Sequence, residues 1–219
     1  MLRLLFEKKG NAVWISHLDL MRLFQRAFQR AGLPLTHTQG FNPRPSVSIA
    51  LPLSVGTESS CELLDFALDD VAFSLQEIKN RLNQCLVDGV RVLDVYDTGR
   101  KLRDLSLLRC TVDLEYDNGI PDGALQGIRA IFQKDSVCVP KRTKNGMQDQ
   151  DIITMIRRLA VMQPDANTLR LDAVVSCQNP TLNPTQLVAA IELYAEQWKP
   201  DFSICARQEI YDMNEVIFR

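Results

Sequence analysis

Apolar and polar residues along the first hundred positions follow two spacings, which together predict strands separated by helices. The helical stretches, with apolar residues three and four apart, cover 20–31 and 75–86. The strand-like stretches cover 3–9, 46–53, 62–68 and 90–96, with a further extended segment at 36–41. The order strand, helix, strand, strand, helix, strand is typical of a ferredoxin-like fold, the split βαβ arrangement.

The helix over 20–31 has the clearest boundaries. Ser16 followed by Asp19 resembles a capping box, and Gly32 and Pro34 end the helical pattern. Beyond it the chain runs through Asn42-Pro43-Arg44-Pro45 between two extended segments. Because each proline fixes φ and removes a backbone donor, we expect a rigid turn there.

A polar, charge-rich stretch at 97–104 separates this half from a second succession of the same kind. Strands are expected at 107–116, 136–142, 169–177 and 202–211, and helices at 124–132 and 186–198. Between 141 and 163 the period is ambiguous, although 151–159 is weakly helical. We therefore predict an α+β protein made of two tandem ferredoxin-like units with antiparallel sheets, residues 1–98 and 105–219. A single composite sheet is the alternative.

Composition and the opening residues indicate where in the cell the protein is located. The 219 residues are 46% hydrophobic and 24% charged, as is usual for a soluble globular protein. The longest apolar runs, such as 49–53 and 187–191, fall far short of the roughly 20 residues that span a bilayer. The opening residues contain charges and no signal-peptide cleavage site. We expect a cytoplasmic protein that makes no membrane contact.

The sequence offers little for catalysis. Its six cysteines contain no C-x-x-C pair, which favours buried reduced thiols over a metal or iron–sulfur site. It also lacks a P-loop, a G-x-G-x-x-G fingerprint, an H-E-x-x-H helix and a G-x-S-x-G elbow. We expect no catalytic residue, metal or cofactor in this chain, so an enzyme is the less favoured interpretation.

Charge is distributed unevenly although the net charge is only −2. Residues 1–50 hold seven basic residues against two acidic ones, whereas residues 51–100 hold four against nine. Within the basic part, Arg22, Arg26 and Arg30 are four apart and therefore stack along one stripe of the first helix. Such a row suits phosphate groups, although an ordinary solvated helix surface explains it equally well.

The segment after this helix carries more hydrogen-bonding groups than a core needs. His37, Gln39 and Arg44 lie close to Gly40, whose missing side chain lets a ligand approach the backbone. Phe41 beside them suits the stacking of an unpaired base, or equally a place in the core.

A second basic patch lies in the other half of the chain. Lys141, Arg142 and Lys144 fall in the sequence KRTKNG, which is also a good turn sequence, so a solvated loop is the alternative. The chain also contains two histidines, His17 and His37. Neither is accompanied in the sequence by a nucleophile in a recognisable setting, so a catalytic role is the weaker interpretation.

The stretch from Trp14 to Ser59 resembles the N-terminal signature of the bacterial radical-SAM-linked protein family, a domain of unknown function. The motifs that carry the resemblance are SHLD, AGLP, GFNP and ALPL-x-VG. The family often has an Asp-x-Arg-Pro element after a Lys-Lys-Gly turn. Here Lys144-Asn145-Gly146 is followed by Asp151-Ile152-Ile153-Thr154, and the Arg-Pro is absent.

The resemblance implies an accessory role beside a radical SAM enzyme, with the iron–sulfur cluster, SAM and cobalamin held by that partner. We therefore hypothesise a non-catalytic protein that binds tRNA or rRNA for modification by that enzyme. The alternatives are a module that docks the radical SAM enzyme without RNA contact, and a stand-alone enzyme using His17 or His37. The expected RNA contacts are Arg22, Arg26, Arg30, His37, Gln39, Phe41, Arg44, Lys141, Arg142 and Lys144.

Overall fold

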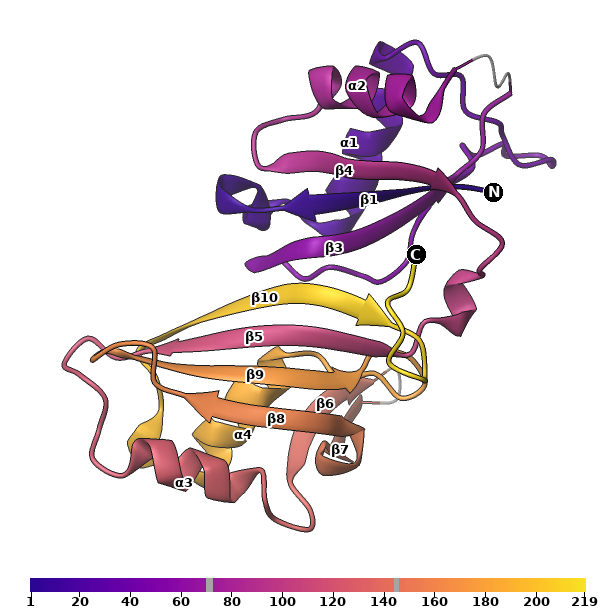
Figure 1. The fold of residues 1–219 in the computed structure, drawn as a ribbon. Coiled ribbons are helices and arrows are strands. Elements are labelled where there is room, and N and C mark those ends of the chain that lie inside the picture. Colours follow the sequence, from indigo (N-terminus) through magenta and orange to yellow (C-terminus); the bar gives the residue numbers. More distant parts are fainter. Residues whose placement is uncertain (70–72, 144–145) are drawn as a thin grey trace. The chain divides into compact units, whose positions relative to one another are not determined.

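The computed structural model describes residues 1–69, 73–143 and 146–219. They form two compact units (Figure 1): unit 1 holds residues 1–102 together with Arg219, and unit 2 holds residues 103–218. Lys144, one of the expected RNA contacts, lies outside the described residues. Every pair of strands within each unit is antiparallel in the described part of the chain.

Unit 1 has the strand and helix order expected of its sequence. Its strands are β1 (Leu2–Lys8), β2 (Val47–Ile49), β3 (Thr57–Phe66) and β4 (Val90–Asp97). Its helices are α1 (His17–Arg30) and α2 (Leu75–Cys85), with a short 3-10 turn, η1 (Gly10–Trp14), before α1. The strands lie side by side in the order β4-β1-β3-β2.

Both helices of unit 1 begin at a serine cap. The Ser16 hydroxyl accepts a hydrogen bond from the Asp19 backbone N–H at 3.2 Å and donates to the Asp19 carboxylate at 2.8 Å. The Ser74 hydroxyl accepts from the Glu77 N–H at 3.2 Å. Each cap satisfies a backbone donor that the first helical turn leaves unpaired, which fixes where the helix starts.

The two helices cover one face of the unit 1 sheet. On α1 the residues at helical spacing, Leu20, Phe24 and Phe28, are completely buried, and they share one apolar core with the strands. The rings of Phe6 and Phe24 lie 4.7 Å apart edge to face, so α1 is fixed against β1. The side of α1 opposite this core is left to solvent.

Unit 2 repeats the succession with one insertion. Its strands are β5 (Leu107–Glu115), β6 (Cys138–Thr143), β7 (Gly146–Asp151), β8 (Ile156–Met162), β9 (Thr168–Ser176) and β10 (Phe202–Tyr211). Its helices are α3 (Ala124–Ile131) and α4 (Thr185–Tyr194), and short 3-10 turns are η2 (Leu102–Asp104), η3 (Ile153–Met155) and η4 (Glu196–Trp198). The sheet order is β10-β5-β9-β8, whereas β6 and β7 form a separate two-stranded sheet.

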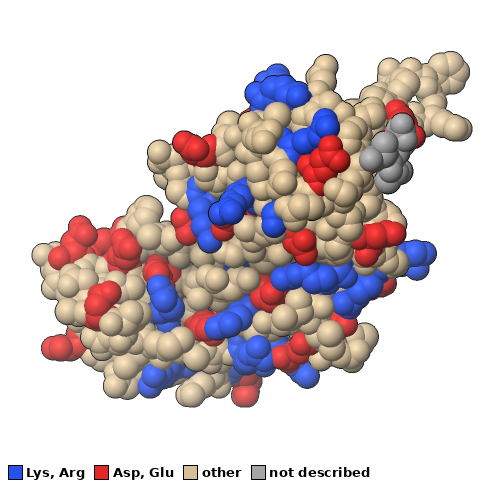
Figure 2. Space-filling view, turned by 45° about the horizontal axis from the view of Figure 1, so that its top comes forward, with Lys and Arg blue, Asp and Glu red and all other residues tan. Residues whose placement is uncertain are grey.

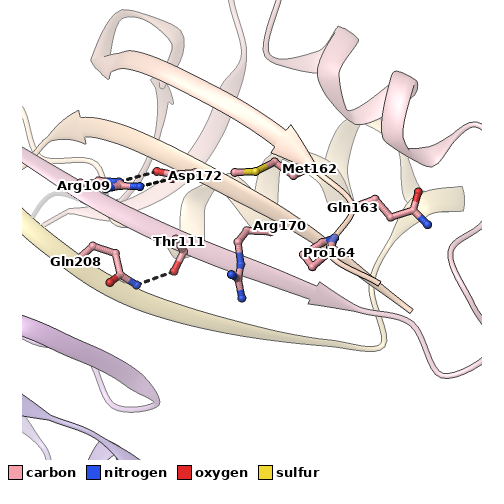
Figure 3. A pocket seen from close by; sticks show the side chains of 8 residues that line it. All are labelled: Arg109, Thr111, Met162, Gln163, Pro164, Arg170, Asp172 and Gln208. Atoms are coloured by element: carbon pink, nitrogen blue, oxygen red, sulfur yellow. Dashed lines mark hydrogen bonds and ion pairs between the residues drawn. The ribbon is translucent and has the colours of Figure 1, made fainter. Parts of the chain in front are cut away.

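The unit 2 sheet has one apolar and one polar face. Along β5, Leu108, Cys110 and Val112 are buried with the apolar residues of α3 and α4, while Arg109 and Thr111 point to the other side. This alternation is the period of two that a half-buried strand requires. The polar face is the one drawn in Figure 3.

Three boundaries differ from the sequence prediction. The weak helix expected at 151–159 is wrong, because this stretch holds the end of β7, the short η3 and the start of β8, which pairs with β9. The extended segment at 36–41 forms only isolated bridges and no regular strand. β3 begins at Thr57, earlier than expected, so pairing with β1 continues beyond the apolar run.

No helix in the described residues is long and apolar enough to cross a bilayer.

Candidate functional site

The exposed side of α1 carries the arginine stripe that the spacing predicts, but its three members differ in their contacts. Arg22 donates to the Asp19 carboxylate at 2.9 Å. The guanidinium of Arg30 donates to the backbone carbonyl of Cys85 on α2. Arg26 is exposed and makes no hydrogen bond or ion pair with a described residue. Of the three arginines, Arg26 is thus the one without a bonded partner among residues 1–69, 73–143 and 146–219.

Asp19 shows why Arg22 is held in place. Its pKa is lowered from 3.8, first by the hydrogen bond from the Ser16 hydroxyl and then by the one from Arg22. The carboxylate therefore stays charged at neutral pH. A phosphate would bind Arg22 less readily than Arg26, because it would have to compete with the Asp19 carboxylate for the Arg22 guanidinium.

The segment after α1 folds back on itself as a narrow turn, which we name the 36–46 hairpin. The Ser46 N–H donates to the Thr36 carbonyl and the Thr38 N–H donates to the Arg44 carbonyl, both at 2.8 Å. The Arg44 N–H in turn donates to the Thr38 hydroxyl at 3.0 Å. These bonds, with the two prolines, hold the two arms together. In Figure 1 this hairpin projects from unit 1 beyond the C-terminal end of α1.

The tip of the 36–46 hairpin presents an aromatic ring to solvent. Phe41 is fully exposed, at 107% relative accessibility, so the alternative of a core phenylalanine is wrong. Gln39 and Arg44 are exposed as well, and their side chains make no hydrogen bond with a described residue. Full burial of a phenylalanine side chain stabilises a fold by about 1.5–3 kcal/mol. Phe41 contributes none of this stabilisation, so the fold does not explain its place at the tip.

Between α1 and the hairpin lies a groove of about 520 Å³, which we name the α1 groove. It is lined by Gln25, Arg26, Gln29, Leu33, Pro34, Leu35, His37, Pro45 and Asp69. Its floor is apolar, because Leu33 and Leu35 are buried beneath it. Its rim is polar and comes from two elements, the outer side of α1 and the first arm of the hairpin. The structure thus brings Arg26 and His37 to one site.

Four polar side chains of this rim are without a partner in the part of the chain that the structure describes. The side chains of Gln25, Arg26, Gln29 and His37 make no hydrogen bond with a described residue. Asp69 and Arg26 both line the groove, which is therefore of mixed charge. Together these groups offer two amides, an imidazole, a cation and an acceptor around an apolar floor, which is a chemistry that suits a polar, partly flat ligand.

A second cavity, of about 480 Å³, lies on the polar face of the unit 2 sheet (Figure 3). Here Arg109 grips Asp172 with two bonds, Nε to Oδ1 at 3.0 Å and Nη2 to Oδ2 at 2.6 Å. Arg170 grips Asp113 in the same way at 2.5 and 2.6 Å. The Gln208 amide donates to the Thr111 hydroxyl at 3.0 Å.

The two arginines on this face are neutralised by the aspartates that they bind. The bidentate hydrogen bonds from Arg109 lower the pKa of Asp172 from 3.8, despite the opposing effect of its partial burial. The same pairing raises the pKa of Arg109, and the hydrogen bond to Asp113 raises that of Arg170. An anionic ligand would have to displace a carboxylate from either arginine. Both arginines of this cavity are paired with aspartates, and none of the described residues that line it is aromatic. The cavity therefore presents neither an unpaired arginine nor a ring for stacking.

The second basic patch of the sequence is divided by the structure. Lys141, on β6, donates from Nζ to the Thr181 carbonyl at 2.9 Å. Arg142, the next residue of the same strand, is exposed. Both belong to unit 2, and neither lines the α1 groove.

The two histidines occupy different ends of α1. His17 opens the helix, and its buried Nδ1 makes no hydrogen bond with a described residue. His37 lies beyond the end of the helix, in the α1 groove. Among the described residues no cluster of three His, Cys, Asp or Glu side chains could hold a metal ion.

Sequence reasoning missed Asp69, which lines the groove from the segment that follows β3. No motif near it in the sequence indicated a binding site. Sequence reasoning also missed the polar face of unit 2. The signal there was the alternation of Arg109, Thr111 and Asp113 along one strand, which faces Asp172 and Arg170 across the β5–β9 pair.

The surface charges agree with this division between paired and unpaired groups. On the face shown in Figure 2, basic and acidic side chains are interspersed, and no broad area of one sign is visible there. This face therefore presents no general electrostatic field that would attract a polyanion.

Comparisons with solved structures describe the fold. A structure titled "Crystal Structure of a Cbf5-Nop10-Gar1 Complex" matches 95% of this chain with a TM-score of 0.53 and 7% identity, and this chain spans about half (48%) of the matched one. A structure of an unknown protein from Galdieria sulphuraria matches 94% of the chain with a TM-score of 0.27 and 11% identity, over 95% of its own length. At such low identity the first likeness concerns fold alone.

Comparison with curated proteins gave no match. A family profile, by contrast, covers most of the sequence. It matches residues 1–184 and is described as "Uncharacterized protein conserved in bacteria (DUF2344)". The matched range includes all of unit 1, and with it α1, the 36–46 hairpin and the groove between them. The chain belongs to the DUF2344 family of bacterial proteins, a domain of unknown function.

Proposed function

We propose that this protein binds RNA through unit 1 and presents it to a separate modifying enzyme. The observation that carries the proposal is the α1 groove, whose rim collects Gln25, Arg26, Gln29 and His37, and these side chains bond to none of the described residues. Polar side chains that form no intramolecular bond at a braced, concave site are available to a ligand. The paired residues of unit 2 lack that property.

Each group has a role in this proposal. Arg26 neutralises a phosphate at the groove's edge, and Arg44 on the hairpin offers a second cation. His37 and the two glutamines hydrogen-bond to ribose or base edges, and Asp69 accepts from an amino or 2′-hydroxyl group. Phe41 at the hairpin tip stacks on an unpaired base. Arg22 and Arg30, each already bonded within the protein, have supporting roles.

RNA suits this set better than a free anion does. The Asp69 carboxylate disfavours a site built for phosphate alone, whereas an apolar floor with amides at its rim suits a nucleoside attached to a phosphate. The 2′-hydroxyl, both donor and acceptor, matches the adjacent carboxylate and imidazole. The enclosed volume of about 520 Å³ is of the order of one nucleotide-sized ligand.

The identity of the modifying enzyme rests on the sequence resemblance. We propose that it is a radical SAM enzyme, that it holds the iron–sulfur cluster, SAM and cobalamin, and that the RNA is a tRNA or rRNA. We further propose that the two units are tandem ferredoxin-like modules, because the sheet orders β4-β1-β3-β2 and β10-β5-β9-β8 follow the same connection pattern.

The test is a titration of labelled RNA followed by fluorescence anisotropy. Arg26→Ala is expected to weaken binding of all sequences and to reduce the salt slope by about 0.7 on a single strand, as loss of one phosphate contact does. Arg91→Ala is the matched control, because Arg91 is exposed on β4 and does not line the groove. Absence of salt-dependent RNA binding, or equal effects of the two substitutions, would refute the proposal.

The second candidate is a protein-docking module, which the exposed Phe41 favours, because an exposed aromatic is also typical of interface anchors. Co-purification with the radical SAM enzyme separates the two. If Phe41→Ala and Arg26→Ala abolish co-purification while RNA affinity is absent in the wild type, unit 1 binds protein and not RNA.

A further inference from the structure

Trp14 is an exposed aromatic residue that the groove does not use. It ends η1, and 66% of its surface is accessible. One part of its ring rests on Gly56, where a Cβ would lie 3.8 Å from Cζ3. Gly56 has φ +79, and its N–H donates to the Val13 carbonyl at 2.9 Å. The ring is therefore supported from below and open to solvent.

Two further apolar side chains are exposed at the same end of α1. Leu18, in the first turn of α1, is 67% exposed, and Val55, next to Gly56, is 53% exposed. A tryptophan left this accessible loses much of the free energy that its burial would give, so the fold alone does not explain it. Exposed groups of this kind commonly mark an interaction site.

This end of unit 1 lies opposite the hairpin. η1 follows the end of β1, where Lys8 faces Ser59 near the start of β3. The hairpin joins the other end, where Leu35 bridges to Leu68 just beyond β3. Figure 1 shows η1 and the hairpin at opposite ends of the unit 1 sheet. α1, with 14 residues and a length of about 21 Å, connects the two ends.

The outer side of α1 forms a path between these ends. Leu18, Arg22 and Arg26 are four residues apart, so they follow one another up the helix face opposite the buried Leu20, Phe24 and Phe28. The path starts at Leu18, four residues after Trp14, and ends at Arg26, which lines the α1 groove. It thus places cations between two exposed aromatic rings.

We infer that unit 1 binds single-stranded RNA along α1, with one base stacked on Trp14 and another held at the α1 groove and Phe41. This inference rests on the proposed RNA binding and names its substrate class. An aromatic ring can stack on a base only where the base is unpaired, because the bases of a duplex already stack on each other. Arg22 and Arg26 between the rings complement the charge of the connecting phosphates.

Trp14 itself reports on this contact. The chain holds two tryptophans, and the other, Trp198, belongs to unit 2, where it packs on Gly127. Titration with an unstructured oligoribonucleotide is expected to quench the tryptophan fluorescence of the wild type. The Trp14→Phe variant, in which Trp198 alone fluoresces, is expected to show no quenching although it still binds.

Affinity gives a second readout that depends on the ring. Stacking on an aromatic side chain is worth roughly 1–3 kcal/mol per base, so Trp14→Ala should weaken single-strand binding about fivefold to more than a hundredfold. Trp14→Leu keeps the apolar bulk without a flat ring and should weaken binding to a similar degree. A duplex of the same sequence should bind more weakly than the single strand. Circular dichroism checks that each variant is folded.

The outcomes separate this inference from the proposed function. If RNA binds in an Arg26-dependent manner while Trp14 fluorescence and Trp14→Ala affinity stay unchanged, the inference is wrong and the proposed function stands. Equal binding by Trp14→Leu and the wild type also overturns it, because a stacked base needs the ring. If no RNA binds, both are wrong, and loss of co-purification of a protein partner with Trp14→Ala would then assign the surface to that partner.

Discussion

At the scale of single residues, Gly127 in unit 2 is a helical glycine that alanine should not replace with a gain in stability. Gly127 lies inside α3, and the ring of Trp198 fills the space where its side chain would be. A Cβ built on Gly127 would lie 1.7 Å from Cη2 and 1.8 Å from Cζ3 of that ring. No contact that short exists in a folded protein, so alanine there requires Trp198 to move.

Gly127→Ala is therefore expected to destabilise the protein by about 1–3 kcal/mol, the usual cost of overpacking a core. In a helix free of such a contact, the same change would stabilise by up to about 1 kcal/mol. Gly99→Ala is the control, because nothing lies within 4 Å of a Cβ at Gly99 and its φ is ordinary. Urea unfolding followed by circular dichroism measures both. A stabilised Gly127→Ala would show that Trp198 does not occupy this place in solution.

The cysteines also differ residue by residue. All six are free, and four of them, Cys61, Cys110, Cys177 and Cys205, are buried, which confirms the expectation of buried thiols for these four. Burial raises the pKa of Cys110 to about 12 and that of Cys205 to about 11. Because the thiolate is the reactive form, both should resist alkylation in the native state.

Iodoacetamide at pH 8 should thus label the partly accessible Cys85 and Cys138 in the native protein, and the buried four only after unfolding in urea. Peptide mass spectrometry over a time course measures the order of labelling. Native labelling of Cys110 as fast as that of Cys138 would contradict the buried position of β5 beneath α3 and α4.

At the scale of elements, the local signals in the sequence were sufficient for some segments and not for others. α1 was predicted because the Ser16 cap and the spacing of Leu20, Phe24 and Phe28 act within the helix itself. The 36–46 hairpin was predicted as a rigid turn for the same reason, since its prolines act locally. β8 was not, because the residues of 141–163 follow no clear period, and the strand at 156–162 is stabilised by its pairing with β9.

The α1 groove, too, could be predicted from the sequence only as far as its residues are neighbours in the chain. Its helix side, Arg26 with the two glutamines, and its hairpin side, His37, could be named from adjacent sequence. Asp69 enters from a segment more than thirty residues later, and its approach depends on the bridge between Leu35 and Leu68. Nor does spacing show that Arg30 turns to the Cys85 carbonyl while Arg26 stays free.

The strand pair β5–β9 gives a prediction on pH. Asp172 has a pKa below 3.8 in the folded protein because of Arg109, so the pair stabilises fully above about pH 3.8 and loses its effect as pH falls through the lowered pKa. Asp172→Asn should therefore cost up to about 1 kcal/mol at pH 7, as for a partly exposed ion pair. The difference from the wild type should shrink below pH 3.8.

A double-mutant cycle with Arg109→Met isolates the pair from other effects of each substitution. Urea unfolding at pH 7 and at acid pH measures it. A coupling free energy that does not fall with pH would mean that Asp172 acts by packing and not by charge.

At the scale of the whole molecule, the balance of charge sets what kind of RNA binding is open to this protein. The chain carries 25 basic and 27 acidic residues, so its net charge of −2 repels RNA weakly at a distance. Attraction must come from cations without an internal partner. Within the described ranges, the cations of the proposed RNA path without a bonded partner are Arg26 and Arg44. Arg22 is bonded to Asp19, and the arginines of the unit 2 face are paired with aspartates.

The number of such cations predicts the salt dependence of binding. For single strands the slope of log K against log salt is about −0.7 per neutralised phosphate, so two to three contacts give a slope of roughly −1.4 to −2. Anisotropy titrations between about 50 and 200 mM KCl measure it. A slope of about −4 or steeper would require further cations, and Lys141 and Arg142 of unit 2 would be the first to substitute. A slope near zero would mean that neither Arg26 nor Arg44 neutralises a phosphate, and it would refute the proposed function.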